Sequence, residues 1–259
     1  MGPGKDRRVT DDRSRALGPG TGSPAVDLGG ACRPLSVRGE HGRGKPVIDC
    51  ECGSGLGTRY LAEAGSVEIR AYDVSDSAVA RARREVSHDT VVFEVADGRD
   101  LPCPSAWADV YVALETIEHV DDDAFLREAA RVLRPGGLLL CSTPNRQLTN
   151  PGSRLTDKPV NSFHVREYSE SELVSLLGRH FASLALYGQN PCRAYWVKGL
   201  TAVARMTSTR IAARANSALQ HARYLRGGNA AHRVEKADKR FAYEYIVYVC
   251  SDQGAGDRE

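Results

Sequence analysis

The chain has 259 residues, of which 41% are hydrophobic and 26% are charged, and this length fits one sizeable domain with extensions. Its net charge of +2 excludes any argument from overall charge for a nucleic-acid partner, and no apolar run is long enough to span a membrane. The first residues lack the apolar core of a secretory signal and the 7 cysteines are an odd number, so we expect a cytoplasmic protein with reduced thiols.

Residues 1–45 are rich in Gly, Pro, Arg and Asp and show neither a helical nor a strand period. That composition predicts a largely disordered N-terminal arm. From Pro46 onwards, apolar strand segments alternate with helical segments. The alternation predicts a parallel sheet with helices on both faces, and we place this core at residues 46–190.

The most informative segment is the run Val-Ile-Asp-Cys-Glu-Cys-Gly-Ser-Gly-Leu-Gly at residues 47–57. An apolar strand there enters a glycine-rich turn, and Gly53, Gly55 and Gly57 let the backbone approach a ligand with no Cβ in the way. Asp73 is expected to close the next strand, where a carboxylate can accept hydrogen bonds from both hydroxyls of a ribose. The segment therefore predicts a crevice that binds a nucleoside.

The elements that follow continue the alternation. Residues 91–98 predict a third strand ending at Asp97, where a carboxylate suits the exocyclic amine of adenine. Residues 108–113 predict a fourth strand, which leads through Leu114 into Glu-Thr-Ile-Glu-His at residues 115–119. A helix, a turn and a fifth strand are then predicted, at residues 122–133, 134–137 and 138–142.

This succession resembles the class I S-adenosylmethionine-dependent methyltransferases, in the subgroup with Glu-x-x-Glu-His after the fourth strand. The resemblance covers residues 46–190, and residues 241–250 fit the final strand of that fold. It implies an α/β, Rossmann-like fold with a seven-stranded, mainly parallel sheet, helices on both faces and an antiparallel last strand. It also implies S-adenosylmethionine as the cofactor, with the candidate contacts Asp49, Glu51, Gly53, Ser54, Gly55, Gly57, Asp73, Val74, Asp97, Gly98, Leu114 and Glu115.

One position departs from the family pattern, because glycine is usual where this chain has Glu51. A carboxylate at this place would either crowd and repel the carboxylate of the cofactor's methionine part or bind its ammonium group. The alternative is a tolerated variant whose side chain points away. A cofactor site that fails because of Glu51 would leave a binding protein without catalytic activity.

Glu115, Glu118 and His119 follow the fourth strand, at the edge where open α/β sheets bind ligands. Two carboxylates and an imidazole suit a divalent cation such as Mg²⁺ or Mn²⁺. The segment resembles ubiquinone-biosynthesis O-methyltransferases and small-RNA 3′-terminal 2′-O-methyltransferases, and that resemblance implies His164, in a downstream loop, as a fourth metal ligand. In the metal-free alternative, Glu115 contacts the cofactor and His119 acts as general base. The catalytic candidates are Glu118 and His119.

The stretch from Leu173 to Val234 has no Asp or Glu, and residues 211–225 carry apolar side chains at helical spacing. We predict a basic helical insertion over residues 191–240, followed by the final strand and a tail at 241–259. One interpretation is an amphipathic helix packed on the domain with a solvated arginine face. The other is a basic surface for an anionic substrate, an RNA or a partner.

Together these features favour an S-adenosylmethionine-dependent methyltransferase that acts on a hydroxyl of a small molecule, such as a secondary metabolite or a sugar, with divalent metal assistance. The alternatives are a metal-free N-methyltransferase of a small amine or amino sugar, and a metal-dependent 2′-O-methyltransferase of an RNA terminus. The expected partner is a small-molecule acceptor and not a membrane. Nucleic acid is not favoured, and a homodimer is left open.

Overall fold

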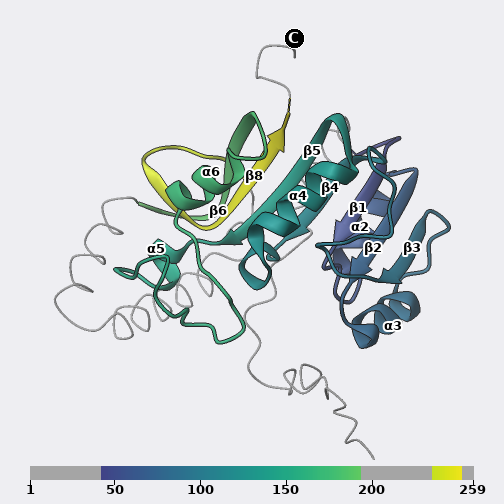
Figure 1. The fold of residues 1–259 in the computed structure, drawn as a ribbon, viewed down its shortest axis with the longest axis horizontal. Helices are drawn as coiled ribbons and strands as arrows, with labels where there is room; N and C mark the ends of the chain where they lie inside the picture. The colour runs from purple at the N-terminus through teal and green to yellow at the C-terminus, as the bar shows by residue number, and fades with distance from the viewer. Residues whose placement is uncertain (1–41, 194–234, 253–259) are drawn as a thin grey trace, which may run out of the picture.

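The computed structural model describes residues 42–193 and 235–252. Over these residues a single sheet extends through the molecule, with helices packed beside it (Figure 1). The strands are β1 (Pro46–Cys50), β2 (Glu68–Asp73), β3 (Val91–Val95), β4 (Ala108–Leu114), β5 (Leu133–Pro144), β6 (Ser183–Arg193), β7 (Glu235–Lys236) and β8 (Phe241–Ser251).

The strand order is β3-β2-β1-β4-β5-β8-β6-β7. The first five strands of the chain pair in parallel, whereas β8 pairs antiparallel with both β5 and β6. This confirms the predicted Rossmann-like sheet with an antiparallel last strand, to which β7 adds a two-residue edge. Because the chain runs outwards from β1 in one direction and from β4 in the other, the carboxyl ends of β1 and β4 form the switch point where such sheets bind ligands.

Short helical segments connect the strands, and side chains cap the starts of several of them. The segments are α2 (Leu56–Glu63), α3 (Asp76–Glu85), the 3₁₀ turn η2 (Ile117–His119), α4 (Asp122–Val132), α5 (Arg146–Thr149) and α6 (Glu170–Leu177). The Ser75 hydroxyl accepts the backbone N–H of Ala78 at the start of α3, and the Asp121 carboxylate accepts that of Ala124 at the start of α4. Helix α3 follows β2 directly, whereas the turn η2 lies between β4 and α4.

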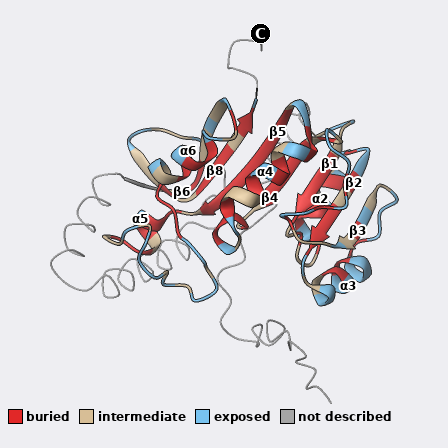
Figure 2. Ribbon diagram, in the orientation of Figure 1, coloured by how far each residue is buried: buried red, intermediate tan, exposed pale blue. Residues whose placement is uncertain are grey.

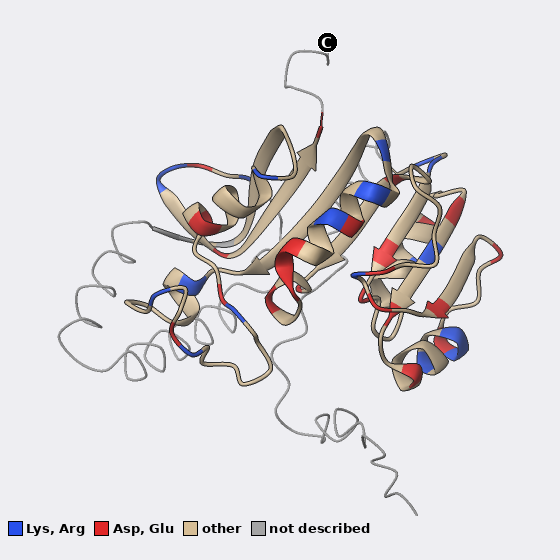
Figure 3. Ribbon diagram, in the orientation of Figure 1, with Lys and Arg blue, Asp and Glu red and all other residues tan. Residues whose placement is uncertain are grey.

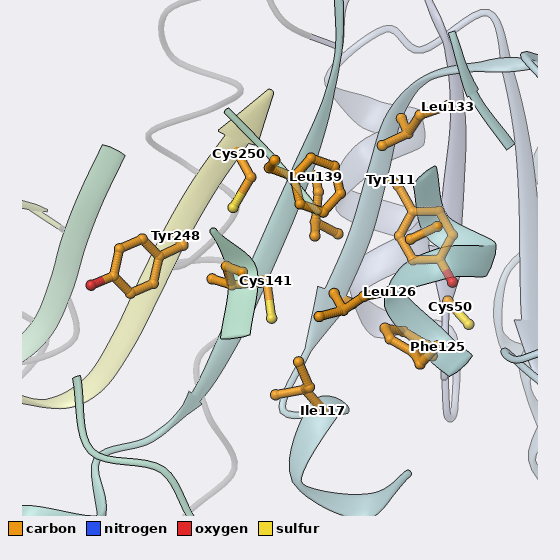
Figure 4. Close-up of a cluster of buried hydrophobic side chains, with 14 of the residues drawn as sticks. Cys50, Tyr111, Ile117, Phe125, Leu126, Leu133, Leu139, Cys141, Tyr248 and Cys250 are labelled. Carbon is orange, nitrogen blue, oxygen red and sulfur yellow. The ribbon is translucent and has the colours of Figure 1, made fainter. Parts of the chain in front are cut away.

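The main core lies between β4, β5 and the helix α4 that covers them (Figures 2 and 4). Tyr111 and Phe125 are fully buried there, and their ring centroids lie 5.9 Å apart in an edge-to-face arrangement. Leu139 and the free thiol of Cys141 continue this core towards β8. Charged residues are frequent on helices α3 and α4 and on the loops, and some also lie on β1 and β2, as Figure 3 shows. The sheet is thus a rigid apolar platform for the polar residues at its edge.

Some predicted elements differ from the structure in their limits. The turn expected at residues 134–137 lies inside β5 as an irregularity, because the pairing with β4 jumps from Leu133 to Leu138. Helices α5 and α6 were not predicted. Residues 1–41 of the predicted arm and residues 194–234 of the predicted insertion lie outside the described residues. No helix in the described ranges is both long enough and apolar enough to cross a membrane.

Candidate active site

The glycine turn predicted from the sequence lies directly after β1. Gly53 and Gly55 have φ angles of +55° and +81°, which side-chain-bearing residues rarely adopt. A Cβ on Gly55 would lie 3.0 Å from Val86 Cγ2 and 3.1 Å from Ala82 Cβ, so this glycine also permits close packing of α3. A Cβ on Gly53 would meet no atom within 4 Å, so the backbone there borders open space in which a ligand can approach.

Asp73 closes β2 and fastens it to the glycine turn. One carboxylate oxygen accepts the backbone N–H of Gly53 at 2.8 Å, and the other accepts that of Ser75 at 2.9 Å. The side chain is therefore held at the carboxyl end of β2, beside the turn, where the sequence placed a ribose-binding acid. Val74, the next residue, exposes 51% of its surface and offers an apolar contact at the same edge.

Asp49 is buried below the turn and accepts the hydroxyl of Thr58 at 2.5 Å. Burial raises its pKa to about 6. Ser54 lies in the turn, while Gly57 is buried in the first helical turn of α2. Asp49 thus connects β1 to α2, and its predicted contact with the methionine part of the cofactor stays a prediction.

Glu51 adopts a left-handed conformation with a φ of +60°, which is costly for a residue with a side chain. Burial and the nearby Asp73 and Asp97 carboxylates raise its pKa to about 7. Within residues 42–193 and 235–252, no hydrogen bond or ion pair is formed by its carboxylate. Glu51 therefore brings backbone strain and an acidic group with a raised pKa to the turn after β1.

Asp97 and Gly98 follow β3, but the structure gives each a local role. The Asp97 carboxylate receives the guanidinium of Arg99 at 2.5 Å, and this bond lowers the pKa of Asp97. A Cβ on Gly98 would lie 2.8 Å from both Cys50 Sγ and Phe125 Cε2. Gly98 is thus required by packing, and an adenine amine at Asp97 would have to share the carboxylate with Arg99.

Glu115 lies just beyond Leu114, the last residue of β4, and turns towards β5. Its φ is +55°, and its carboxylate accepts the hydroxyl of Ser142 at 2.7 Å. Burial and the neighbouring Glu118 raise the pKa of Glu115 well above its usual value. The group of possible metal ligands that the structure brings together does not include Glu115.

The other three predicted metal ligands do come together. Ligand atoms of Glu118, His119 and His164 all lie within 4.8 Å of one another. The two imidazole rings contact each other edge to face, with centroids 4.9 Å apart. The Glu118 side chain is buried, and neither of its carboxylate oxygens has a hydrogen-bond partner among the described residues. Burial raises the pKa of Glu118 to about 7.

The loop at residues 161–168 brings His164 to this cluster through main-chain bonds. The backbone N–H groups of Val165 and Arg166 donate to the carbonyl of Glu118, at 2.8 and 3.2 Å. The carbonyl of Phe163 lies 3.0 Å from His119 Nδ1, so it accepts the Nδ1 proton and leaves the Nε2 lone pair of His119 free. Burial is the largest influence on His119 and lowers its pKa, which favours the neutral ring.

His164 has two neighbours that the sequence reasoning missed. Its Nδ1 lies 3.1 Å from a carboxylate oxygen of Glu167, and its Nε2 lies 2.9 Å from the amide nitrogen of Asn161. The side chains of His164 and Glu167 are 9% and 3% exposed. The sequence shows only that His164 and Glu167 are three residues apart. That spacing does not predict that the loop buries both side chains.

A divalent cation fits this cluster on two observations. The Glu118 carboxylate is a buried acceptor without a partner, and the fixed Nδ1 proton of His119 leaves one ring nitrogen available. One carboxylate with two imidazoles suits Mn²⁺ better than Mg²⁺, which prefers oxygen ligands. Glu118, His119 and His164 are therefore the residues that would hold such an ion.

Residues 48–141 match the protein family described as a methyltransferase domain. A protein of Mycobacterium tuberculosis named a probable S-adenosylmethionine-dependent methyltransferase is 40% identical over 146 residues, which make up 56% of this chain and 51% of that protein. The 27-O-demethylrifamycin SV methyltransferase of Amycolatopsis mediterranei is 41% identical over 101 residues, or 37% of each protein. The chain thus spans about half the length of the first of these relatives and less of the second.

Solved structures share the fold over most of the chain. An S-adenosylmethionine-dependent methyltransferase from Mesorhizobium loti superposes with a TM-score of 0.53 and covers 86% of this chain and 98% of its own. Its sequence identity of 19% shows a common fold and carries no argument about substrate.

Proposed function

Because the chain contains a class I S-adenosylmethionine-dependent methyltransferase domain, we propose that the protein transfers the methyl group of this cofactor to a hydroxyl oxygen of a small molecule. The observation that supports an oxygen acceptor is the polar cluster at the end of β4. There a buried, unpartnered Glu118 carboxylate lies beside His119, whose free ring nitrogen can receive a proton. The name of the Amycolatopsis relative describes methylation of a hydroxyl oxygen on a small molecule, which agrees with this proposal.

The reaction needs alignment and a destination for one proton. The acceptor oxygen attacks the methyl carbon in line, the bond between that carbon and sulfur breaks, and its electron pair stays on sulfur as S-adenosylhomocysteine forms. In the metal-free form of the reaction the hydroxyl proton passes to His119 Nε2, because Nδ1 already donates to the Phe163 carbonyl. If Nε2 instead held a cation, that ion would lower the pKa of the hydroxyl and the proton would leave to solvent. The lowered pKa of His119 keeps the ring neutral and able to accept that proton near neutral pH. The glycine turn and Asp73 hold the cofactor, so proximity supplies much of the rate.

Glu118, His119 and His164 are also the residues that would hold a divalent cation. Such an ion would lower the pKa of an acceptor hydroxyl and orient its oxygen. A competing observation favours the metal-free form of the reaction, because both ring nitrogens of His164 already have partners in the loop. In that form His119 is the base, and small amines become acceptors as well as alcohols.

The test is calorimetric titration of Mn²⁺ and Mg²⁺ into protein saturated with S-adenosylhomocysteine, for the wild type and Glu118→Gln. A panel of phenols, catechols, sugars and amines is then assayed for methyl transfer with and without chelator. We expect binding of S-adenosylhomocysteine, saturable Mn²⁺ uptake that Glu118→Gln abolishes, and chelator-sensitive transfer to a vicinal diol or catechol. Cofactor binding without metal uptake would refute metal assistance, and transfer only to amines would refute the oxygen acceptor.

Glu172→Gln is a matched control for the loss of a carboxylate. Glu172 receives Arg146 at 2.6 Å and lies in α6, and it does not belong to the group of Glu118, His119 and His164. Its substitution should lower stability and leave metal uptake unchanged. Equal loss of metal uptake in both variants would mean that the loss in Glu118→Gln is not specific to the Glu118 carboxylate.

A further inference from the structure

His164 is held from both sides by its own loop. The Glu167 carboxylate lies 3.1 Å from Nδ1, and the Asn161 amide nitrogen lies 2.9 Å from Nε2. The amide nitrogen of Asn161 can only donate, so Nε2 accepts and the proton of the ring sits on Nδ1, facing Glu167. The two neighbours therefore agree on a single tautomer.

The setting of Glu167 makes this contact strong. Its side chain is 3% exposed, and its second carboxylate oxygen has no hydrogen-bond partner among the described residues. Burying a carboxylate with a single hydrogen bond costs folding free energy. We therefore expect the bond between Glu167 and His164 to have a function. The backbone N–H groups of Val165 and Arg166 bind the same loop to the Glu118 carbonyl, which keeps His164 and Glu167 next to the cluster.

We propose that Glu167 is a positioning residue, which fixes the tautomer and ring orientation of His164 so that its Nε2 lone pair serves the cluster of Glu118 and His119. This deepens the proposed function and rests on it for the use of the cluster. Carboxylates that orient a histidine through its other ring nitrogen raise its basicity and hold its ring in place. If this cluster held a cation, His164 Nε2 would be its ligand in place of the Asn161 contact, and Glu167 would remain the partner of Nδ1.

The direct test is nitrogen NMR of the protein labelled with ¹⁵N-histidine, as wild type, Glu167→Ala and Glu167→Gln. The signals of His164 are identified by their absence from His164→Gln. We expect the wild type to report a protonated Nδ1 and an unprotonated Nε2. Glu167→Ala should lose this fixed tautomer, whereas Glu167→Gln should keep it, because the amide oxygen can still accept the Nδ1 proton.

The second readout is Mn²⁺ affinity. Removing an orienting carboxylate weakens metal binding by about 10- to 100-fold, so we expect a loss of that size in Glu167→Ala and partial recovery in Glu167→Gln. A wild type that takes up no Mn²⁺ refutes the metal part of the proposed function, and the tautomer measurement then decides the role of Glu167 alone. An unchanged His164 tautomer in Glu167→Ala overturns the inference.

A similar pair outside the cluster is the control. His180 Nε2 lies 3.1 Å from Asp123, and this contact lies between α4 and the end of α6. Asp123→Asn should shift the His180 signals and leave the His164 signals and Mn²⁺ affinity unchanged. If Glu167→Ala does not fold, as circular dichroism would show, Glu167→Asp withdraws the carboxylate by one methylene and provides the same comparison.

Discussion

Substituting Gly53 and Gly55 of the glycine turn one at a time distinguishes the effect of packing on stability from the effect of ligand access on affinity. Gly53 and Gly55 both have positive φ, and alanine in that conformation costs about 1 to 2 kcal/mol. For Gly53→Ala the new methyl group meets open space, so the cost stops there. For Gly55→Ala the methyl group would lie 3.0–3.1 Å from Val86, Ala82 and Phe93. Overpacking of this kind adds about 1 to 3 kcal/mol, so the expected total is about 2 to 5 kcal/mol.

The assay is urea denaturation followed by circular dichroism, with S-adenosylhomocysteine affinity measured by calorimetry on the folded variants. We expect Gly55→Ala to lose clearly more unfolding free energy than Gly53→Ala. We expect Gly53→Ala to lose cofactor affinity by about tenfold or more, because its methyl group occupies the space next to Asp73 that a ligand needs. Equal losses of stability, or unchanged affinity in Gly53→Ala, would show that this reading of the turn is wrong.

Two further predictions concern buried acids. Burial raises the pKa of Glu118 from 4.5 to about 7. The folded state therefore keeps its full stability below about pH 4.5, where Glu118 is protonated, and loses stability as the pH rises through about 7 and the buried side chain becomes charged. Glu118→Gln should therefore exceed the wild type in unfolding free energy by about 3 kcal/mol near pH 8 and lose that advantage near pH 4, as urea denaturation at each pH would show. Glu51→Gly should raise the unfolding free energy by about 1 kcal/mol, because it relieves a φ of +60°; a lower melting temperature in calorimetry would contradict this.

The sequence predicted the parts of the molecule that follow from local pattern. The glycine turn and Asp73 were found because apolar strands, glycines and a spaced acid follow each other along the chain. Helix α6 was also readable, since Ser169 and Glu172 form a capping box just before an apolar run, but this signal was missed. Local pattern was therefore enough for the scaffold and for the positions of the glycine turn and Asp73.

The rest of the site depends on how distant segments pair. Glu115 turns to Ser142 because β4 and β5 align Leu114 with Ser142, a register that no single segment specifies. The burial of Glu167 beside His164 depends on a loop that folds against the Glu118 carbonyl. The sequence therefore predicted that Glu118, His119 and His164 lie together, but it did not predict that Glu167 and Asn161 contact His164.

The loop at residues 161–168 is fastened to the turn after β4 through main-chain atoms: the Glu118 carbonyl, the Phe163 carbonyl and the N–H groups of Val165 and Arg166. Every amino acid except proline supplies these atoms, so the side chains of Phe163 and Val165 take no part in these bonds. Phe163 and Val165 meanwhile expose 61% and 64% of their surface. These two outward side chains can therefore be replaced, and the surface of the loop changed, while His164 keeps its place beside Glu118 and His119.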